Sequence, residues 1–463
     1  MRAAIAAGHP ATVEAGLEVL QERGSATDAA VAASLASCVA ETVMTGLLGG
    51  GHAIYYDAAS RRARNLDCFI AVPGLEPGPR EHAELLELEV PFGTELVRYA
   101  IGVASCGVPG VPAGLEALHR EHGRLPWARL VEPALRLARD GVEFPPAHAS
   151  CLAMLAPVMT MDEGARIYAP GGALLAAGES LQQPGLARAL ELLTEEGAAS
   201  MYRGSLAEAL LELMDERGGL VTAADLGAYE ARWSEPVEIS YAGTRVLTRA
   251  GLAPLGECLE RLPRLSGLGA SERALTLARV LDGAGPESHT TNVAVVDSDG
   301  NACVATTSLG LGSGDFVPGL DMHLNSMLGE ADLVRGPLRP GERMSSMMSP
   351  TVALGAAGLE LAGGAAGGTR LRSALVQVMA GILDEGLTPA DAVSRSRLHP
   401  TAGVVHLEPG FDEEVSPKLV EAGYEVRAWP TQHHYFGGVS VVTPNGAAGD
   451  PRRSGGSATL RNH

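Results

Sequence analysis

Two threonines that follow a loose, Gly- and Pro-containing stretch are the residues of this sequence whose types and positions point most directly to chemistry. Thr290 and Thr291 come after Gly283-Ala-Gly-Pro-Glu-Ser-His289, which has the composition of a flexible, cleavable connector. A Thr pair that enters a strand is usually explained by β-propensity alone. If the chain is cut before Thr290, however, the new α-amine, with an unperturbed pKa of about 8, can take the proton of the Thr290 hydroxyl. Thr290 is therefore the candidate nucleophile, and the bond between His289 and Thr290 is the candidate site of self-cleavage.

The residues after Thr290 predict a β-hairpin that brings a second hydroxyl beside it. Residues 291–297 alternate as a strand, Ser298-Asp-Gly-Asn301 is a strong turn signal, and residues 302–309 are typical of the returning strand. Because Thr290 and Ser308 lie at about equal separations from this turn, the hairpin places them opposite each other. We expect Ser308 to steady the Thr290 hydroxyl by a hydrogen bond.

A glycine-rich turn supplies a candidate oxyanion hole. Gly363-Gly-Ala-Ala-Gly-Gly-Thr-Arg370 links a predicted strand to a helix predicted over 370–385. Backbone N–H groups at such a turn, aided by the positive end of the helix, can stabilise an oxyanion. Taken alone, a plain tight turn explains this run better. Gly367 and Gly368 are the candidate donors.

The elements that must position these groups predict an α/β protein. One helix is expected over residues 10–23, and a second begins at about residue 27. The stretch from 107 to 250 is expected to be mostly helical, with helices over 184–197 and 204–217 among others. Strands are expected over 52–57, 351–355 and 358–363, and near 403–407, 424–428 and 438–443. We therefore predict helices around a core sheet that is mixed or antiparallel.

Composition excludes several functional classes. The 463 residues carry a net charge of −20, which disfavours binding to nucleic acid. No stretch approaches the roughly 18 apolar residues of a membrane span, and we see no signal peptide. The six cysteines are scattered without a CxxC pair, so neither a metal site nor a disulfide framework is supported. We expect reduced thiols in a cytoplasmic enzyme that needs no cofactor and acts on a small molecule.

Taken together, these residues resemble the γ-glutamyltranspeptidase family over nearly the whole chain. The likeness is carried by His9-Pro10, Glu14 to Leu20, Asp28 to Ala33, Gly107-Val-Pro-Gly110, Pro133 to Gly141, Gln183-Pro184, Asp225-Leu226, Tyr229, Thr290-Thr291, Asp297, Asp299-Gly-Asn301, Ser349-Pro-Thr351, Gly367-Gly368 and Asp450-Pro-Arg452. The resemblance implies the four-layer αββα sandwich of N-terminal-nucleophile hydrolases. It also implies self-cleavage into a large subunit, residues 1–289, and a small subunit, residues 290–463, which stay together as a heterodimer.

The substrate clamp of that family is altered in this sequence. Members of the family hold the α-carboxylate and α-amine of a γ-glutamyl group with polar side chains. The matching substrate-binding positions here are Phe69 for an Arg, Gly310 for an Asn, Met327 in the segment Asn325-Ser-Met327, Glu330 for the acidic amine ligand, and Ser346 beside Met347 for a pair of serines. The Pro-rich serine segment between the two halves is replaced by Gly251-Leu-Ala-Pro254. A Phe ring offers no donor to a carboxylate, whereas an Arg binds one with two charge-assisted hydrogen bonds.

The altered clamp favours a substrate other than glutathione. The first hypothesis is a biosynthetic C–C bond hydrolase, similar to the family members associated with 4-alkylproline formation in the lincomycin and pyrrolobenzodiazepine pathways. The alternative is an amidase or acylase, or a γ-glutamyl hydrolase or transferase acting on a modified substrate; a non-catalytic scaffold is a minor alternative. Arg343, Arg370 and Arg372 are candidates for a replacement cation, although an ordinary structural ion pair explains each of them. His52, His323, His433 and His434 are similarly better explained as polar structure than as pocket residues.

Overall fold

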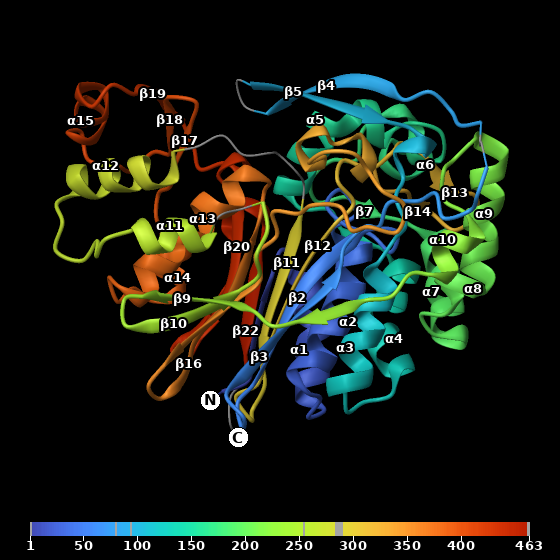
Figure 1. The fold of residues 1–463 in the computed structure, drawn as a ribbon, viewed down its shortest axis with the longest axis horizontal. Coiled ribbons are helices and arrows are strands. Elements are labelled where there is room, and N and C mark those ends of the chain that lie inside the picture. Colours follow the sequence, from blue (N-terminus) through green and yellow to red (C-terminus); the bar gives the residue numbers. More distant parts are fainter. Residues whose placement is uncertain (1, 79–80, 93–94, 253–254, 283–289, 461–463) are drawn as a thin grey trace.

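The computed structural model describes residues 2–78, 81–92, 95–252, 255–282 and 290–460, and it is a four-layer αββα sandwich (Figure 1). One seven-stranded sheet has the order β22-β1-β11-β12-β2-β3-β8. Its strands are β1 (Ala4–Ala7), β2 (Gly50–Asp57), β3 (Arg62–Cys68), β8 (Arg232–Ser234), β11 (Thr291–Val296), β12 (Ala302–Ser308) and β22 (Gly456–Thr459). The fold predicted from the sequence is confirmed.

The second large sheet has six strands in the order β21-β20-β16-β15-β10-β9 and faces the first. Its strands are β9 (Val237–Tyr241), β10 (Thr244–Thr248), β15 (Thr351–Gly355), β16 (Gly358–Ala366), β20 (Gly438–Thr443) and β21 (Gly446–Ala448). All the strand pairs recorded in these two sheets are antiparallel. Small apolar side chains from both sheets, such as Ala294, Val304 and Ala362, fill the space between them.

Helices cover the outer face of each sheet. Beside the seven-stranded sheet lie α1 (Pro10–Gln21), α2 (Ala26–Ala40), α3 (Val111–His122), α4 (Trp127–Asp140), α7 (Pro184–Glu196), α8 (Ser200–Arg203), α9 (Ser205–Arg217) and α10 (Ala223–Gly227). Beside the six-stranded sheet lie α11 (Leu255–Arg261), α12 (Ala270–Leu281), α13 (Thr369–Leu383), α14 (Pro389–Ser394) and α15 (Val415–Glu421).

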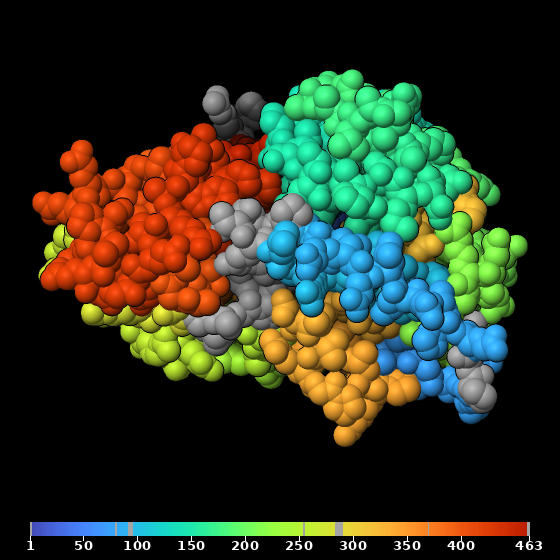
Figure 2. All heavy atoms as spheres, turned by 90° about the horizontal axis from the view of Figure 1, so that it is seen from above, coloured from blue at the N-terminus to red at the C-terminus, as the bar shows by residue number. Residues whose placement is uncertain are grey.

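Smaller elements lie around this frame. The hairpin of β4 (Leu86–Phe92) and β5 (Glu95–Ile101) runs across the top of the molecule in Figure 1, near α5 (Pro146–Met159) and α6 (Glu163–Tyr168). Three small sheets are formed by β6 (Val142–Glu143) with β7 (Ser180–Leu181), by β13 (Phe316–Val317) with β14 (Met322–His323), and by β17 (Leu398–Thr401), β18 (Val404–Leu407) and β19 (Glu425–Ala428). Figure 2 shows α5 against the C-terminal segment, where Ala147 N donates to Ser454 Oγ at 3.4 Å.

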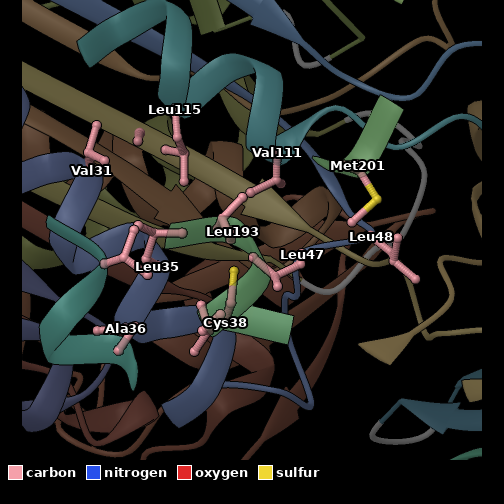
Figure 3. Packing of buried hydrophobic residues seen from close by; sticks show 14 of the residues in the cluster. Val31, Leu35, Ala36, Cys38, Leu47, Leu48, Val111, Leu115, Leu193 and Met201 are labelled. Atoms are coloured by element: carbon pink, nitrogen blue, oxygen red, sulfur yellow. The ribbon is translucent and has the colours of Figure 1, made fainter. Parts of the chain in front are cut away.

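Helix α2 shows why its sequence suits the layer under the sheet. Ser25 and Asp28 form a capping box at its N-terminus, so two otherwise unpaired N–H groups are satisfied. Every residue of α2 is buried, which is possible because most of its side chains are small. Figure 3 shows Val31, Leu35 and Cys38 of this helix packed among leucines and valines from the neighbouring segments. The all-round apolar pattern of residues 26–40 is that of a helix buried on all sides.

Two strand regions differ from the expectation. The stretch 107–250 contains β8, β9 and β10 near its C-terminal end in addition to its helices. Strand β1 lies second from one edge of the seven-stranded sheet, between β22 and β11, although its four residues, Ala-Ile-Ala-Ala, carry no alternation. The strands expected near 403–407 and 424–428 are present as β18 and β19, and they pair with each other in a small separate sheet.

Candidate active site

The candidate nucleophile lies at the end of the sandwich where β11 begins. The β11–β12 ladder ends at the pair Thr291↔Thr307, so one further step places Thr290 opposite Ser308. Ser308 is in turn paired with Gly50 at the start of β2. Thr290 is 2% exposed and Ser308 is fully buried. The hairpin register derived from the sequence therefore holds, and it brings the two hydroxyl residues side by side.

Strand alternation sets the direction of the Thr290 side chain. Thr291 points to the helical layer, because its hydroxyl donates to the Glu41 carboxylate at the end of α2. Asn292 points into the space between the two sheets, where its amide donates to Ser440 O at 3.4 Å and its Oδ1 accepts from Thr306 at 2.7 Å. Since successive side chains point to opposite faces, Thr290 shares the direction of Asn292. That direction leads toward the six-stranded sheet.

The glycine turn lies at the same end of the sandwich, on that opposite sheet. Strand β16 ends at Ala366, which pairs with Gly438, and α13 begins directly after Gly368. Gly367 and Gly368 have φ angles of 123° and 60°, which L side chains rarely adopt. A Cβ at Gly367 would lie 2.9 Å from Gly437 Cα. Among the described residues neither glycine N–H donates a hydrogen bond, so both are available to an oxyanion.

Arg453 fixes the backbone of the candidate nucleophile. This buried residue belongs to η6 (Pro451–Arg453), and its Nη1 donates to Thr290 O at 3.4 Å and to Met44 Sδ at 3.3 Å. Glu41, Thr290, Arg453 and His148 line a cavity of about 10 Å³ behind the start of β11. Glu41, His148 and Arg453 were not predicted from the sequence, where only the position of Arg453 beside Asp450-Pro-Arg452 offered a signal.

Several altered clamp positions come together in one apolar cluster. Phe69, Met327 and Met347 are buried and belong to the same cluster. Its other buried members are Ile70, Val72, Leu333, Met344 and Met348. Phe69 follows β3, whose last residue pairs with Gly51 of β2, so this cluster lies at the same end of the seven-stranded sheet as Ser308. Where the family resemblance implies a polar clamp, the chain has thioether and aromatic side chains.

Ser346 lies beside this cluster and its groups have partners within the chain. Its hydroxyl accepts from Met348 N at 3.3 Å. Its carbonyl accepts from Leu252 N at 2.9 Å and from Arg249 Nη1 at 3.2 Å. The segment that replaces the Pro-rich serine stretch therefore contacts Ser346 through Leu252.

Glu330 is a buried carboxyl next to Gly310. It is 1% exposed, and neither oxygen has a hydrogen-bond partner of good geometry among the described residues, although Ser326 Oγ and Leu311 N lie nearby. Burial, reinforced by Asp332, raises the pKa of Glu330 to about 8. A Cβ at Gly310 would overlap Oε1 of Glu330, and the φ of Gly310 is 71°. The Glu330 carboxyl therefore requires the glycine that stands where the family has an Asn.

The remaining cations and imidazoles make structural contacts. Arg343 lies 4.1 Å from the centre of the Tyr229 ring and 3.5 Å from Asp67. Arg370 and Arg372 donate to Tyr435 O and Leu281 O at 3.2 Å and 2.7 Å. His52 stacks on Phe69 with ring centres 5.4 Å apart, and burial lowers its pKa well below the usual value, so the ring is neutral. His323 accepts from Gly314 N at 3.0 Å, His433 accepts from Tyr435 N at 3.1 Å, and the rings of His433 and His434 lie 4.0 Å apart.

His289, on the far side of the candidate cleavage site, lies outside the described residues. Within the described ranges no group of three or more His, Cys, Asp or Glu side chains is placed to hold a metal ion. The helices in that same part of the chain include none that is long and apolar enough to cross a membrane.

A family model decides the membership of the chain. The γ-glutamyltranspeptidase model matches residues 12–264 and 271–460. This chain belongs to the γ-glutamyltranspeptidase family. Among curated relatives, the acylase ACY 1 proenzyme of Pseudomonas sp. (strain SE83) is 28% identical over 96% of this chain and 90% of its own length. The glutathione hydrolase proenzyme of Escherichia coli (strain K12) is 26% identical over 88% of this chain and 83% of its own length.

Solved structures share the fold of this family member. Cephalosporin acylase from Bacillus halodurans is 24% identical with a TM-score of 0.83, covering 100% of this chain and 96% of that one. LmbA2991 is 21% identical with a TM-score of 0.83, covering 99% of this chain and 98% of that one. Family membership, together with relatives that are acylases and hydrolases, supports hydrolase activity.

Proposed function

We propose that this chain is a self-processing hydrolase with Thr290 as its nucleophile, and that it breaks a C–C bond of an activated ketone in a biosynthetic pathway. Cleavage between His289 and Thr290 gives a large subunit, residues 1–289, and a small subunit, residues 290–463. Ser308 steadies the Thr290 hydroxyl, and the N–H groups of Gly367 and Gly368 bind the oxyanion.

The observation that carries the change of substrate in this proposal, away from a γ-glutamyl group, is the apolar cluster of Phe69, Met327 and Met347 at the clamp positions. A buried carboxylate without a charged partner costs several kcal/mol, so these side chains disfavour the α-carboxylate end of a γ-glutamyl group. Flexible thioethers and a Phe ring instead suit an apolar substituent of varied shape. The retained hydroxyls and glycine turn beside the altered clamp indicate conserved chemistry on a different substrate.

The proposed reaction uses the same groups for a ketone as for an amide. As Thr290 Oγ attacks the ketone carbon, its proton passes to the α-amine of the same residue. The oxyanion is stabilised by the N–H groups of Gly367 and Gly368. When the tetrahedral species collapses, the C–C bond breaks, and the leaving carbon keeps the electron pair and takes the proton from the ammonium group. Water then hydrolyses the Thr290 ester, which releases a carboxylic acid and restores the hydroxyl. The structural likeness to LmbA2991 supports this candidate at the level of the fold.

A second candidate is an acylase that hydrolyses an amide. It is favoured by the likeness to the acylase ACY 1 proenzyme over 96% of this chain and by the shared fold with cephalosporin acylase. Both relatives are named as acylases, and an apolar acyl group would suit the Phe69 cluster equally well. A γ-glutamyl substrate in modified form belongs with this candidate, whereas a non-catalytic scaffold would leave Thr290 and Ser308 without a role.

The test compares three kinds of substrate with the purified protein. They are an activated ketone whose leaving carbanion is conjugated, an N-acyl amide with an apolar acyl chain, and a chromogenic γ-glutamyl anilide. We expect kcat/KM for the ketone to exceed that for the anilide by about 100-fold or more, because the clamp lacks its charge-assisted pair. Thr290→Ala is the control and should release no product. Preferential turnover of the amide would select the acylase, and rapid turnover of the anilide would contradict the clamp argument.

A further inference from the structure

The loop that follows α2 contacts both strands of the candidate catalytic hairpin, one residue away from each hydroxyl. At one end of this loop, Glu41 Oε2 accepts a hydrogen bond from the hydroxyl of Thr291, the neighbour of Thr290. At the other end, Thr45 Oγ1 donates at 2.8 Å to Thr307 Oγ1, and Thr307 is the neighbour of Ser308. Leu309 N also donates to the carbonyl of the loop residue Met44 at 3.3 Å.

The two contacts lie on the face of the sheet opposite to the catalytic candidates. Thr291 and Thr307 are direct cross-strand partners, so their side chains share one face of the hairpin. Thr290 and Ser308 each lie one residue farther along, so they share the other face. When the Thr291 side chain at the start of β11 is held toward the helices, the Thr290 side chain therefore points to the opposite face, toward Gly367 and Gly368.

This hold becomes more important once the chain is cut. Thr290 is then a chain end, and chain ends fray unless they are tied down. At the start of β11, Arg453 binds the Thr290 carbonyl and Glu41 binds the next side chain, so these two contacts fix neighbouring residues from different elements. A displacement of about 1 Å at a nucleophile can cost roughly 100-fold in rate.

We propose that Glu41, assisted by Thr45, is a positioning residue that holds Thr291 and Thr307 on the helical side and so aims Thr290 and Ser308 at the oxyanion turn. This role rests on the proposed function of Thr290 and extends it to residues of the large subunit. Glu41 does not touch the reacting atoms. It acts through the side chain of Thr291 and the backbone of β11.

The environment of Glu41 makes its hold sensitive to pH. Its two oxygens accept from Thr291 and, at 2.7 Å, from Thr12 of α1, and burial raises its pKa to about 7. Among the described residues, Arg453 and Asp450 from the C-terminal segment and His148 from α5 line the same cavity as Glu41, and Cys38 of α2 lies close enough to interact with its charge. Burial lowers the pKa of His148 to about 3, so its imidazole is neutral, and burial raises the pKa of Cys38, so its thiol stays protonated. Asp450 is paired with Arg397 at 2.6 Å. When Glu41 is protonated, one of its two oxygens becomes a hydrogen-bond donor and only one remains a good acceptor. The charged form therefore accepts better from the hydroxyls of both Thr291 and Thr12.

The matched variants separate this role from general packing. Glu41→Ala removes the carboxyl, and Thr291→Val removes the donor on the strand while keeping the shape of the side chain. Glu41→Gln keeps the size of residue 41 and, like protonation, replaces one acceptor oxygen with a donor, but it cannot titrate. Thr12→Val is the control, because the Thr12 hydroxyl contacts the same carboxylate without touching the hairpin.

The experiment follows self-cleavage after refolding by intact mass spectrometry, between pH 5.5 and 8.5, together with hydrogen–deuterium exchange of residues 291–296. We expect Glu41→Ala and Thr291→Val to slow cleavage about tenfold or more and to speed exchange at the start of β11. Thr12→Val should slow cleavage less than Thr291→Val, because it removes a hydrogen bond to Glu41 but leaves the contact between Glu41 and the hairpin in place. Glu41→Gln should cleave with a rate that no longer falls as pH drops through about 7.

The outcomes keep this inference separate from the proposed nucleophile. If the wild type is cut and Glu41→Ala matches it in both rate and exchange, the positioning role is refuted while Thr290 stands. If Glu41→Gln keeps the wild-type pH profile, the titrating role of Glu41 is refuted. If the wild type stays whole, the nucleophile proposal fails, and the exchange measurement on the uncut chain still tests the hold on β11. Thermal melting of each variant identifies any that fails to fold, and Glu41→Gln then carries the test.

Discussion

At the scale of single residues, Glu330 shows how the altered clamp affects the stability of the folded chain. Its carboxyl is buried beside Gly310, and burial raises its pKa from 4.5 to about 8. The folded state therefore holds a proton that the unfolded state releases above about pH 4.5. This contribution to stability is fully present below the unfolded pKa and is lost as pH rises through about 8.

Glu330→Gln should remove that pH dependence. We expect the free energy of unfolding of the variant, relative to that of the parent, to rise by up to roughly 3–5 kcal/mol from pH 5 to pH 8.5. The reason is that a Gln stays neutral, so unfolding no longer releases the proton. Urea unfolding at both pH values measures the difference, in a Thr290→Ala background that keeps the chain whole. The exposed Glu14→Gln serves as control. An equal difference at the two pH values would show that Glu330 is ionised in the folded protein.

Residue types in the sequence predicted part of this site and left part of it hidden. Thr290, Ser308 and the glycine pair could be found because each stands at a turn or strand end that the local sequence marks. Phe69 and Met327 stood out as departures at their positions, but their joining of one cluster depends on contacts between distant segments. Glu41 could not be found, because an acidic residue after a helix is common and its partner Thr291 lies far along the chain.

At the scale of elements, the β11–β12 hairpin depends on one side chain at its turn. Asp297 Oδ1 accepts from Asp299 N and Asn301 N, each at 3.0 Å. Its Oδ2 accepts from Asn301 Nδ2 and from Ala26 N, again at 3.0 Å, so the same carboxylate links the turn to the first residue of α2. The turn signal in the sequence predicted the hairpin, whereas the link to the helix appears only in the structure.

Asp297→Ala should destabilise the protein by about 2–4 kcal/mol, because it leaves buried N–H groups without an acceptor. It should also slow self-cleavage, since both strands that carry the candidate hydroxyls start from this turn. Thermal melting and the cleavage rate measure the two effects. Asp299→Ala is the control, because Asp299 is exposed and, among the described residues, its side chain pairs with the exposed Arg124. Similar losses in the two variants would mean that the Asp297 hydrogen bonds do not stabilise the hairpin.

Elements with strong local patterns were predictable, and elements defined by their neighbours were not. Helices α1 and α2 carry a Pro or a capping box at the start and small or amphipathic faces, so their bounds follow from the sequence. Strand β1 has only four residues, three of them alanine, and its place between β22 and β11 is set by the sheet around it. Strands β9 and β10 lie after a long run of helices, where the dominant helical texture hides their alternation.

At the scale of the whole molecule, the seven-stranded sheet interleaves the two proposed subunits. Strand β1 of the large subunit lies between β22 and β11 of the small subunit, and β11–β12 lie between β1 and β2 of the large one. Separation would break ladders on both sides of β1 and one beside β12. The cut chains are therefore expected to stay together under native conditions and to separate only when the sheet unfolds.

Intact mass spectrometry of the wild type and of Thr290→Ala, under native and denaturing conditions, tests the central claim most directly. We expect the denatured wild type to give two chains divided between His289 and Thr290, and the native wild type to give one complex of both. Thr290→Ala should give one uncut chain under either condition. A wild type that stays whole in every folding condition, or a Thr290→Ala variant that is cut at the same bond, would contradict the assignment of Thr290 as the self-released nucleophile.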